Sequence, residues 1–111
     1  MVDSAPPLDE VFHALASAPR RQLLRTLADG ERTVGDLARP FDMSLAAVSK
    51  HLKVLEAARL VERHSSGRTT SCRLTPGPLA DVREWVDFYE RFWTTRIDAL
   101  EAMFRPEEET K

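Results

Sequence analysis

The side chains in this chain that could do chemistry are mostly basic, and they are concentrated in its middle. Residues 44–73 carry six basic and two acidic side chains, a net charge of +4, whereas residues 1–43 and 74–111 carry −2 and −4. Attraction to phosphate depends on the local field rather than on the total charge, which is only −2. The middle segment is therefore a candidate for binding the phosphates of a nucleic acid.

Catalysis has little support in the sequence. The three histidines (His13, His51 and His64) are scattered, the only cysteine is Cys72, and there is no glycine-rich phosphate loop. These residues make no nucleophile and base pair. We expect no enzyme activity, no catalytic residue, no metal site and no cofactor, with Cys72 an inert strand residue unless its two nearby arginines lower its pKa.

Two lysines of the middle segment share one face of a helix that the sequence predicts from Ser44, its N-cap, to Glu56. At 100° per residue Lys50 and Lys53 lie opposite an apolar arc, which is formed by Leu45, Val48, Leu52 and Leu55. A helix that is anchored on one face and basic with low relief on the other suits a DNA groove.

The candidate DNA contacts on this helix are Ser44, Ala46, Ala47, Ser49, Lys50, His51 and Lys53. Ser44 caps the helix and could also meet a phosphate there. Ser49 and His51 lie on the flanks, and either DNA contact or a local bond fits each of them. Ala46 and Ala47 either contact thymine methyl groups or are simply small.

A short helix precedes the basic helix, and a hairpin follows it. Residues 33–36 (Thr-Val-Gly-Asp) resemble a capping box, and Pro40 closes the short helix, so residues of about 33–58 predict a helix-turn-helix. Residues 65–67 (Ser-Ser-Gly) indicate the turn of a hairpin over about 60–74 that carries Arg63, His64 and Arg68. A basic hairpin at this place is a wing, with Arg68 as the candidate for groove contact, or else an ordinary solvated hairpin.

The segments outside this unit are predicted to be helical. Residues 8–16 are predicted to form one helix, and a second begins with Ser17 or Ala18 as its N-cap and Pro19 in its first turn, and ends at Gly30. Arg20, in its first turn, either reaches phosphate or lies exposed in solvent.

One helical pattern runs from residue 79 to 104, and five of the eight aromatic residues lie between 85 and 93. So wide an apolar surface predicts a dimerisation helix that also packs on its own domain; the alternative is a core helix within one chain. The candidate dimer residues are Val11, Phe12, Trp85, Tyr89, Phe92, Trp93 and Ile97. The aromatic residues could also line a pocket for a small apolar effector.

The expected fold is mainly α with a small β-hairpin: a single domain over 8–104 between a flexible arm (1–7) and a flexible acidic tail (105–111). We expect a cytoplasmic chain without a signal peptide or membrane span.

In residues 18–24, 33–38 and 43–57, above all in the Ser-Lys-His-Leu-Lys-Val-Leu run of 49–55, the chain resembles the ArsR/SmtB-type winged helix-turn-helix repressors. The resemblance implies a homodimer on an inverted-repeat operator, joined through the first and last helices. Metal-sensing members carry Cys-Val-Cys-Asp-Leu where this chain has Thr-Val-Gly-Asp-Leu at 33–37, and the last helix here has no histidine. Metal sensing at either place is therefore not expected.

Together these features predict a sequence-specific DNA-binding regulator that acts as a repressor. The alternative is a winged-helix module that binds another protein instead of DNA, which the net acidity and the aromatic helix would favour.

Overall fold

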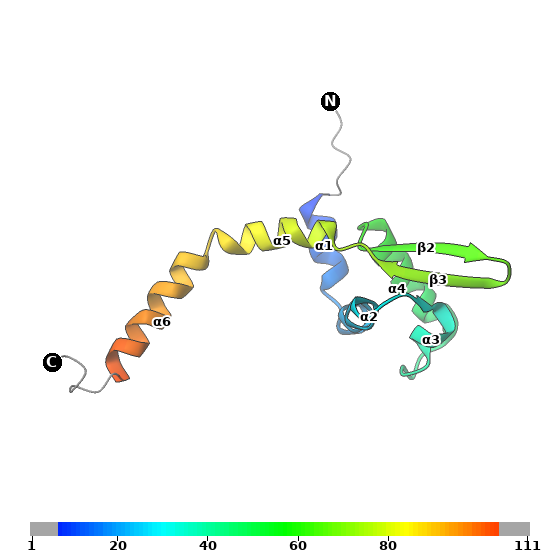
Figure 1. Ribbon diagram of the computed structural model, residues 1–111, viewed down its shortest axis with the longest axis horizontal. Coiled ribbons are helices and arrows are strands. Elements are labelled where there is room, and N and C mark those ends of the chain that lie inside the picture. The colour runs from blue at the N-terminus through cyan, green and yellow to red at the C-terminus, as the bar shows by residue number, and fades with distance from the viewer. Residues whose placement is uncertain (1–6, 105–111) are drawn as a thin grey trace, which may run out of the picture.

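The computed structural model describes residues 7–104, in which a helical domain with a small sheet continues into a C-terminal helical arm, residues 77–104, called the arm from here on (Figure 1). The elements are α1 (Leu8–Leu15), α2 (Ala18–Ala28), β1 (Arg32–Thr33), α3 (Val34–Ala38), α4 (Leu45–Ala57), β2 (Val61–Ser66), β3 (Thr69–Leu74), α5 (Gly77–Asp87) and α6 (Glu90–Phe104). The radius of gyration is 19.7 Å, against about 13 Å for a compact domain of this length. The arm accounts for the excess, since it extends away from the domain on the side opposite the hairpin.

The core lies where α1, α2 and α4 pack together, and α4 and α2 also contact the sheet. Its fully buried large side chains come from these elements, from α3 and from the segment between α4 and β2: Val11, Leu23, Leu37, Val48, Leu52, Leu55, Leu60 and Cys72. The predicted fold, mainly α with a small hairpin, is confirmed.

Three predicted N-caps are present. Ser17 Oγ accepts a hydrogen bond from Arg20 N–H at 3.4 Å, Thr33 Oγ1 from Asp36 N–H at 3.1 Å, and Ser44 Oγ from Ala47 N–H at 3.1 Å. The second half of the capping box differs from the prediction, because the Asp36 carboxylate pairs with Arg39 at 3.0 Å. These caps fix where α2, α3 and α4 begin, and α3 and α4 form the helix-turn-helix.

Helix α4 ends in backbone hydrogen bonds that the sequence does not predict. Leu60 N–H donates to Leu55 C=O and Arg59 N–H to Glu56 C=O, both at 2.9 Å, which is the Schellman pattern. Arg59 has the positive φ (60°) that this motif requires and that glycine usually supplies. Leu60 and Leu55, the two positions between which this motif usually forms a hydrophobic contact, are both fully buried in the core.

The sheet has three antiparallel strands in the order β1-β3-β2, and β1 is an addition to the predicted hairpin. Strand β2 runs through Ser65 and Ser66, so the loop is shorter than predicted and consists of Gly67 and Arg68. Gly67 has φ +64° at the first loop position, as a type II′ turn requires. This short turn places Arg68 at the tip of the wing.

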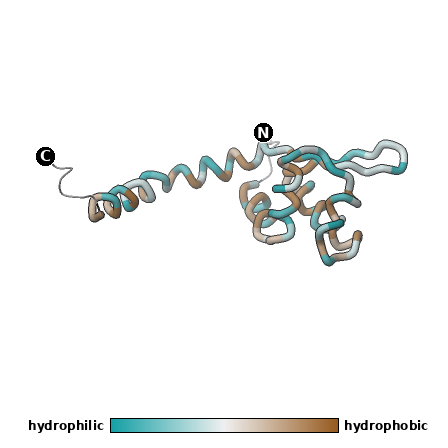
Figure 2. The backbone as a smooth tube through the Cα atoms, turned by 60° about the horizontal axis from the view of Figure 1, so that its bottom comes forward, coloured by the Kyte–Doolittle hydropathy of each residue, from teal (hydrophilic) through white to brown (hydrophobic). Residues whose placement is uncertain are grey.

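The helical stretch predicted over 79–104 is present as two helices. A turn at Phe88 and Tyr89 separates α5 from α6, and Tyr89 N–H bonds to Val86 C=O, three residues back, at 2.9 Å. Leu79 and Val82 pack on the core, but neither helix has a fully buried residue. Hydrophobic residues recur along both helices (Figure 2). No helix within residues 7–104 has the length and apolar character needed to cross a membrane.

Candidate nucleic-acid interface

Helix α4 has a buried face and an exposed face, as predicted, with one correction at its start. Val48, Leu52 and Leu55 are 0% exposed, whereas Leu45, predicted to be in the core with them, is 57% exposed. Leu45 lies in the first turn of α4, where it lines a groove between α4, α3 and the wing instead of packing in the core. Lys50 and Lys53 are exposed on the opposite face, together with Ala46.

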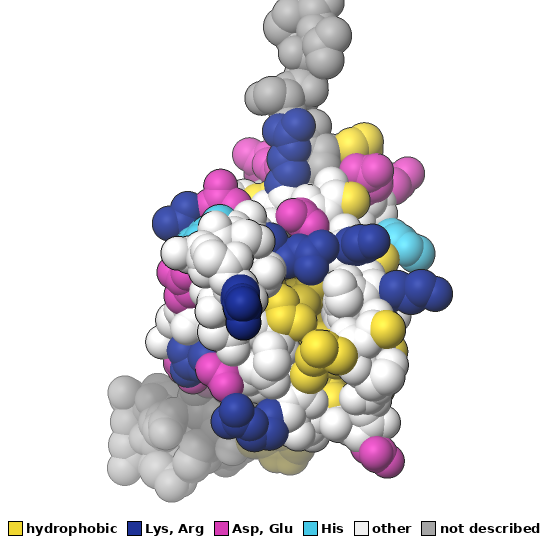
Figure 3. Space-filling view, turned by 90° about the vertical axis from the view of Figure 1, so that its right-hand side faces the viewer, with side chains coloured by type: hydrophobic (Ala, Val, Ile, Leu, Met, Phe, Trp, Pro, Cys, Tyr) yellow, Lys and Arg dark blue, Asp and Glu magenta, His cyan; other side chains and the backbone are white. Residues whose placement is uncertain are grey.

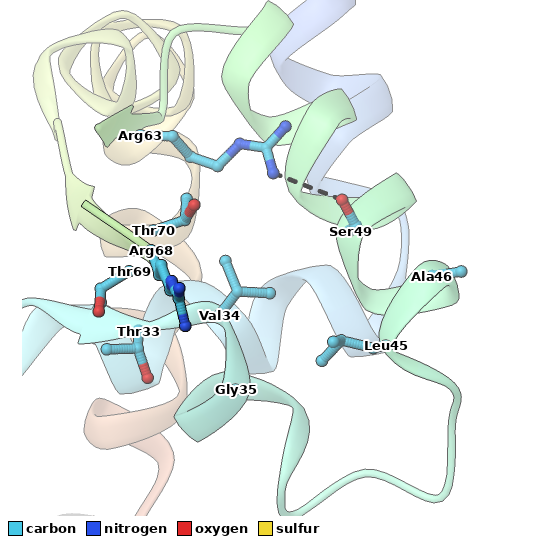
Figure 4. A pocket seen from close by; sticks show the side chains of 10 residues that line it. All are labelled: Thr33, Val34, Gly35, Leu45, Ala46, Ser49, Arg63, Arg68, Thr69 and Thr70. Carbon is cyan, nitrogen blue, oxygen red and sulfur yellow. Dashed lines mark hydrogen bonds between the residues drawn. The ribbon is translucent and has the colours of Figure 1, made fainter. Parts of the chain in front are cut away.

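A groove of about 610 Å³ lies between the beginning of α4, α3 and the wing (Figure 4). Leu45 and Ser49 line it from α4, Val34 from α3, and Arg63 and Arg68 from the wing. The other lining residues are Thr33, Gly35, Ala46, Thr69 and Thr70. The lining therefore includes two arginines and no carboxylate, which suits an anionic ligand.

Arg63 lies inside the domain rather than at the wing tip where the sequence places it. Its Nε lies 3.3 Å from Glu56 Oε1 and its Nη1 donates to Ser49 Oγ at 3.4 Å, and its side chain is 19% exposed. Arg63 therefore attaches β2 to two turns of α4. This also gives Ser49 the local bond that the sequence leaves open.

Arg20 is likewise occupied within the domain. Its guanidinium donates to the carbonyl oxygens of Ala14 at 2.7 Å and His13 at 2.9 Å, and its Nη1 lies 3.2 Å from His51 Nδ1. His51, which the sequence leaves open between DNA and a neighbouring element, thus bonds to α2. Arg20 is itself part of α2, so these bonds link α2 to the end of α1 and to α4.

Of the cationic side chains predicted to contact DNA, Lys50, Lys53 and Arg68 are exposed. Figure 3 looks onto the wing end of the molecule and shows hydrophobic side chains near the centre, with Lys and Arg groups and some Asp and Glu groups around them. Farther back on the wing, His64 Nε2 lies 2.9 Å from Glu31 Oε2, so this histidine faces the loop before β1. Apolar side chains with lysines and arginines beside them suit contact with base edges in a DNA groove and with the neighbouring phosphates.

The described residues contain no group of three or more His, Cys, Asp or Glu side chains arranged to hold a metal. Thr33 caps α3, and Gly35 lines the groove. Cys72 is buried in β3, and this burial raises the pKa of its thiol. The opposing effect of Arg63 is smaller, so the arginine does not activate the thiol.

A second candidate surface runs along the arm. Trp85, Tyr89, Phe92, Trp93 and Ile97 are all exposed, and the Trp85 ring packs edge-on against Phe12 at 5.4 Å between centroids. An apolar hollow of about 330 Å³ lies among the residues Trp85, Val86, Tyr89, Phe92 and Trp93. Val11 is also predicted to be a dimer residue, but it is only 1% exposed in the core of its own chain. It therefore has no surface with which to contact a second chain.

Known proteins share this fold and much of this sequence. Residues 18–63 match the model of the family described as bacterial regulatory protein, arsR family. The HTH-type transcriptional regulator Rv2034 of Mycobacterium tuberculosis is 44% identical over 89 residues, 80% of each chain. The transcriptional repressor SdpR of Bacillus subtilis is 32% identical over 79 residues, 71% of this chain and 88% of its own.

The crystal structure of an ArsR family transcriptional regulator superposes with a TM-score of 0.73 at 36% identity, covering 78% of this chain and 96% of the other. The shared helices, wing and sequence identity agree with the resemblance in residues 18–57. The chain therefore belongs to the ArsR family of bacterial transcriptional regulators.

Proposed function

We propose that this regulator represses transcription as a cytoplasmic homodimer that binds an inverted-repeat operator. In each protomer the beginning of α4 enters the major groove and the wing tip lies over the adjacent minor groove. The groove between α4 and the wing supports this proposal most directly, because its lining includes the exposed Arg68 and no acidic side chain, while Arg63 beside it is paired with Glu56. A strand of the DNA backbone passes there.

The exposed cations have separate roles in this proposal. Lys50 and Lys53 on α4 contact phosphates or base edges, and Arg68 at the turn reaches into the minor groove. Ser44, Ala46 and Ala47 lie in or beside the first turn of α4, where a groove-bound helix contacts base edges. Arg20, Arg63, Ser49 and His51 act indirectly, since their bonds hold α4 against α2 and the wing.

The homodimer rests on the exposed apolar side chains of the arm. A partner copy would cover Trp85, Tyr89, Phe92, Trp93 and Ile97, with Phe12 of α1 beside them. A two-fold dimer presents two α4 helices related by symmetry, which is why its operator is an inverted repeat. A small apolar effector would bind in the hollow around Trp85 and Trp93 and change the spacing of the two helices.

A binding titration tests the proposal. Duplexes are selected by the purified protein from a randomised pool, and affinity for the enriched sequence is measured against salt concentration. We expect enrichment of an inverted repeat and an affinity that falls steeply with salt. Failure to enrich any sequence would contradict DNA recognition and favour the protein-binding alternative.

Variants then assign the contacts. Lys50→Ala and Arg68→Ala should each weaken operator binding by about 1–3 kcal/mol and leave the dimer and its melting temperature unchanged. Arg83→Ala serves as the control, because Arg83 is an exposed arginine on the arm and pairs there with Asp87. Loss of binding that is matched by loss of folding would contradict the contact assignment.

A further inference from the structure

Leu45 is a large apolar side chain that the fold leaves exposed at the tip of α4. It is 57% exposed, although Val48 on the next turn is fully buried. Helix formation does not require leucine here, because the Ser44 cap begins the helix. Figure 4 shows the Leu45 side chain directed into the groove between α4, α3 and the wing. Its exposed surface is therefore available to contact a ligand in this groove.

We propose that Leu45 recognises the 5-methyl group of a thymine in each operator half-site, an inference that rests on the proposed DNA binding. Thymine is the one standard DNA base that presents a methyl group in the major groove, and apolar side chains recognise it by contact. Leu45 has no polar group and cannot read any other base edge by hydrogen bonding.

The groove around Leu45 offers apolar contacts for a thymine methyl group and arginines for the phosphate of the same nucleotide. Val34 adds apolar surface to the same groove, and Ala46 next to it is too small to hold the DNA away. Arg63 and Arg68 line the opposite side, and no carboxylate in the lining would repel the backbone. Because one side of the groove is apolar and the other carries arginines, the groove suits a nucleotide better than a purely apolar ligand.

The test removes one methyl group at a time. In the duplex enriched by selection, each thymine is replaced in turn by deoxyuridine, which keeps the base pair and lacks only the methyl group. At one symmetric position we expect the dissociation constant to rise about fourfold for each methyl group removed, the ratio that corresponds to burial of one such group. Substitution at the other thymines should have little effect.

Variants connect this effect to Leu45. Leu45→Ala should bind the thymine and deoxyuridine duplexes almost equally, whereas Leu45→Met should retain most of the preference because it keeps an apolar side chain. Lys53→Ala is the matched control on the same helix: it should weaken binding to both duplexes and keep their ratio. Melting temperatures should stay near that of the unchanged protein, because Leu45 is not in the core.

Three outcomes would overturn the inference. If no deoxyuridine substitution matters although the operator is bound specifically, Leu45 contacts sugars or no DNA, and only this inference fails. If Leu45→Ala retains the full thymine preference, another side chain reads the methyl group. If selection enriches no sequence at all, the proposed DNA recognition fails as well.

Discussion

At the scale of single residues, the basic side chains near α4 divide into those that bond within the domain and those that remain exposed. Arg20 donates to two carbonyl oxygens at the end of α1 and lies against His51, and Arg63 bonds to Glu56 and Ser49. Lys50 and Arg68 are exposed. The first pair should therefore control stability and the second pair DNA affinity.

Arg20→Ala should lower the free energy of unfolding by about 2 kcal/mol, because it leaves the carbonyl oxygen of buried Ala14 and the ring of half-buried His51 without their charged partner. Arg20→Lys should not restore the stability, since one ammonium group cannot reach three acceptors arranged for a guanidinium. Urea denaturation of the purified variants measures both changes.

Arg21→Ala is the matched control for Arg20. Arg21 is the exposed neighbour, and its guanidinium donates to Leu15 C=O at 2.8 Å in an exposed hydrogen bond, so loss of the side chain should cost about 0.5 kcal/mol or less. A stable Arg20→Ala variant with weakened operator binding would instead support the phosphate contact that the sequence suggests for Arg20.

Cys72 should react with thiol reagents only when the chain unfolds. Its thiol is buried and its pKa is raised by that burial, so the native protein at pH 8 should react at least about tenfold more slowly than the protein in urea. Rapid reaction of the native protein would contradict this and would favour redox sensing by Cys72.

The same shift gives a pH dependence with a definite sign. Above pH 9.0, the ordinary pKa of the thiol, the unfolded chain loses this proton before the native one does. Stability should therefore fall with rising pH there, and Cys72→Ala should show a smaller fall. Urea midpoints of both proteins across this range measure the difference.

At the scale of elements, the sequence predicts the starts and ends of the first four helices to within two residues. Thr33 and Ser44 are caps whose side chains act on backbone groups three residues away, so the sequence alone is enough to predict them, and it narrows the third cap to Ser17 or Ala18. The Schellman motif that ends α4 could not be predicted in this way, because Arg59 takes a conformation typical of glycine. The break between α5 and α6 has neither proline nor glycine, and β1 has two residues whose strand character comes only from pairing with β3.

Gly67→Ala should destabilise the wing by about 1 kcal/mol, because alanine at φ +64° is strained although nothing lies within 4 Å of the added carbon. Gly77→Ala is the control: it also adds a carbon in open space but has no positive φ, so stability should be unchanged or rise slightly. Thermal unfolding of both variants compares them. Equal effects would contradict the type II′ turn.

At the scale of the whole molecule, charge and apolar surface are separated. The cationic groove lies beside the wing and the exposed aromatic residues lie along the arm, at the other end of the structure (Figure 1). The sequence predicts both regions, because the basic residues and the aromatic residues each cluster along the chain. It does not separate Val11, which is buried, from Phe12, which packs against the arm, since both follow the same helical period.

Trp93→Glu should convert the dimer to monomers without unfolding them. Trp93 is 57% exposed, so a carboxylate there is solvated in the monomer and would be buried against apolar side chains in the dimer. Because two half-sites bind far better when linked, affinity for the inverted repeat should fall by at least about 10²-fold. Sedimentation and operator titration measure the two effects.

Ala102→Glu is the control for charge and helix content. Ala102 follows Trp93 by nine residues, which places it on the opposite side of α6 at 3.6 residues per turn, and it is also exposed. This variant should remain a dimer and bind the operator normally. If Trp93→Glu also stays dimeric, the aromatic face of α6 is not covered by the second copy, and the apolar hollow beside it is open to an effector.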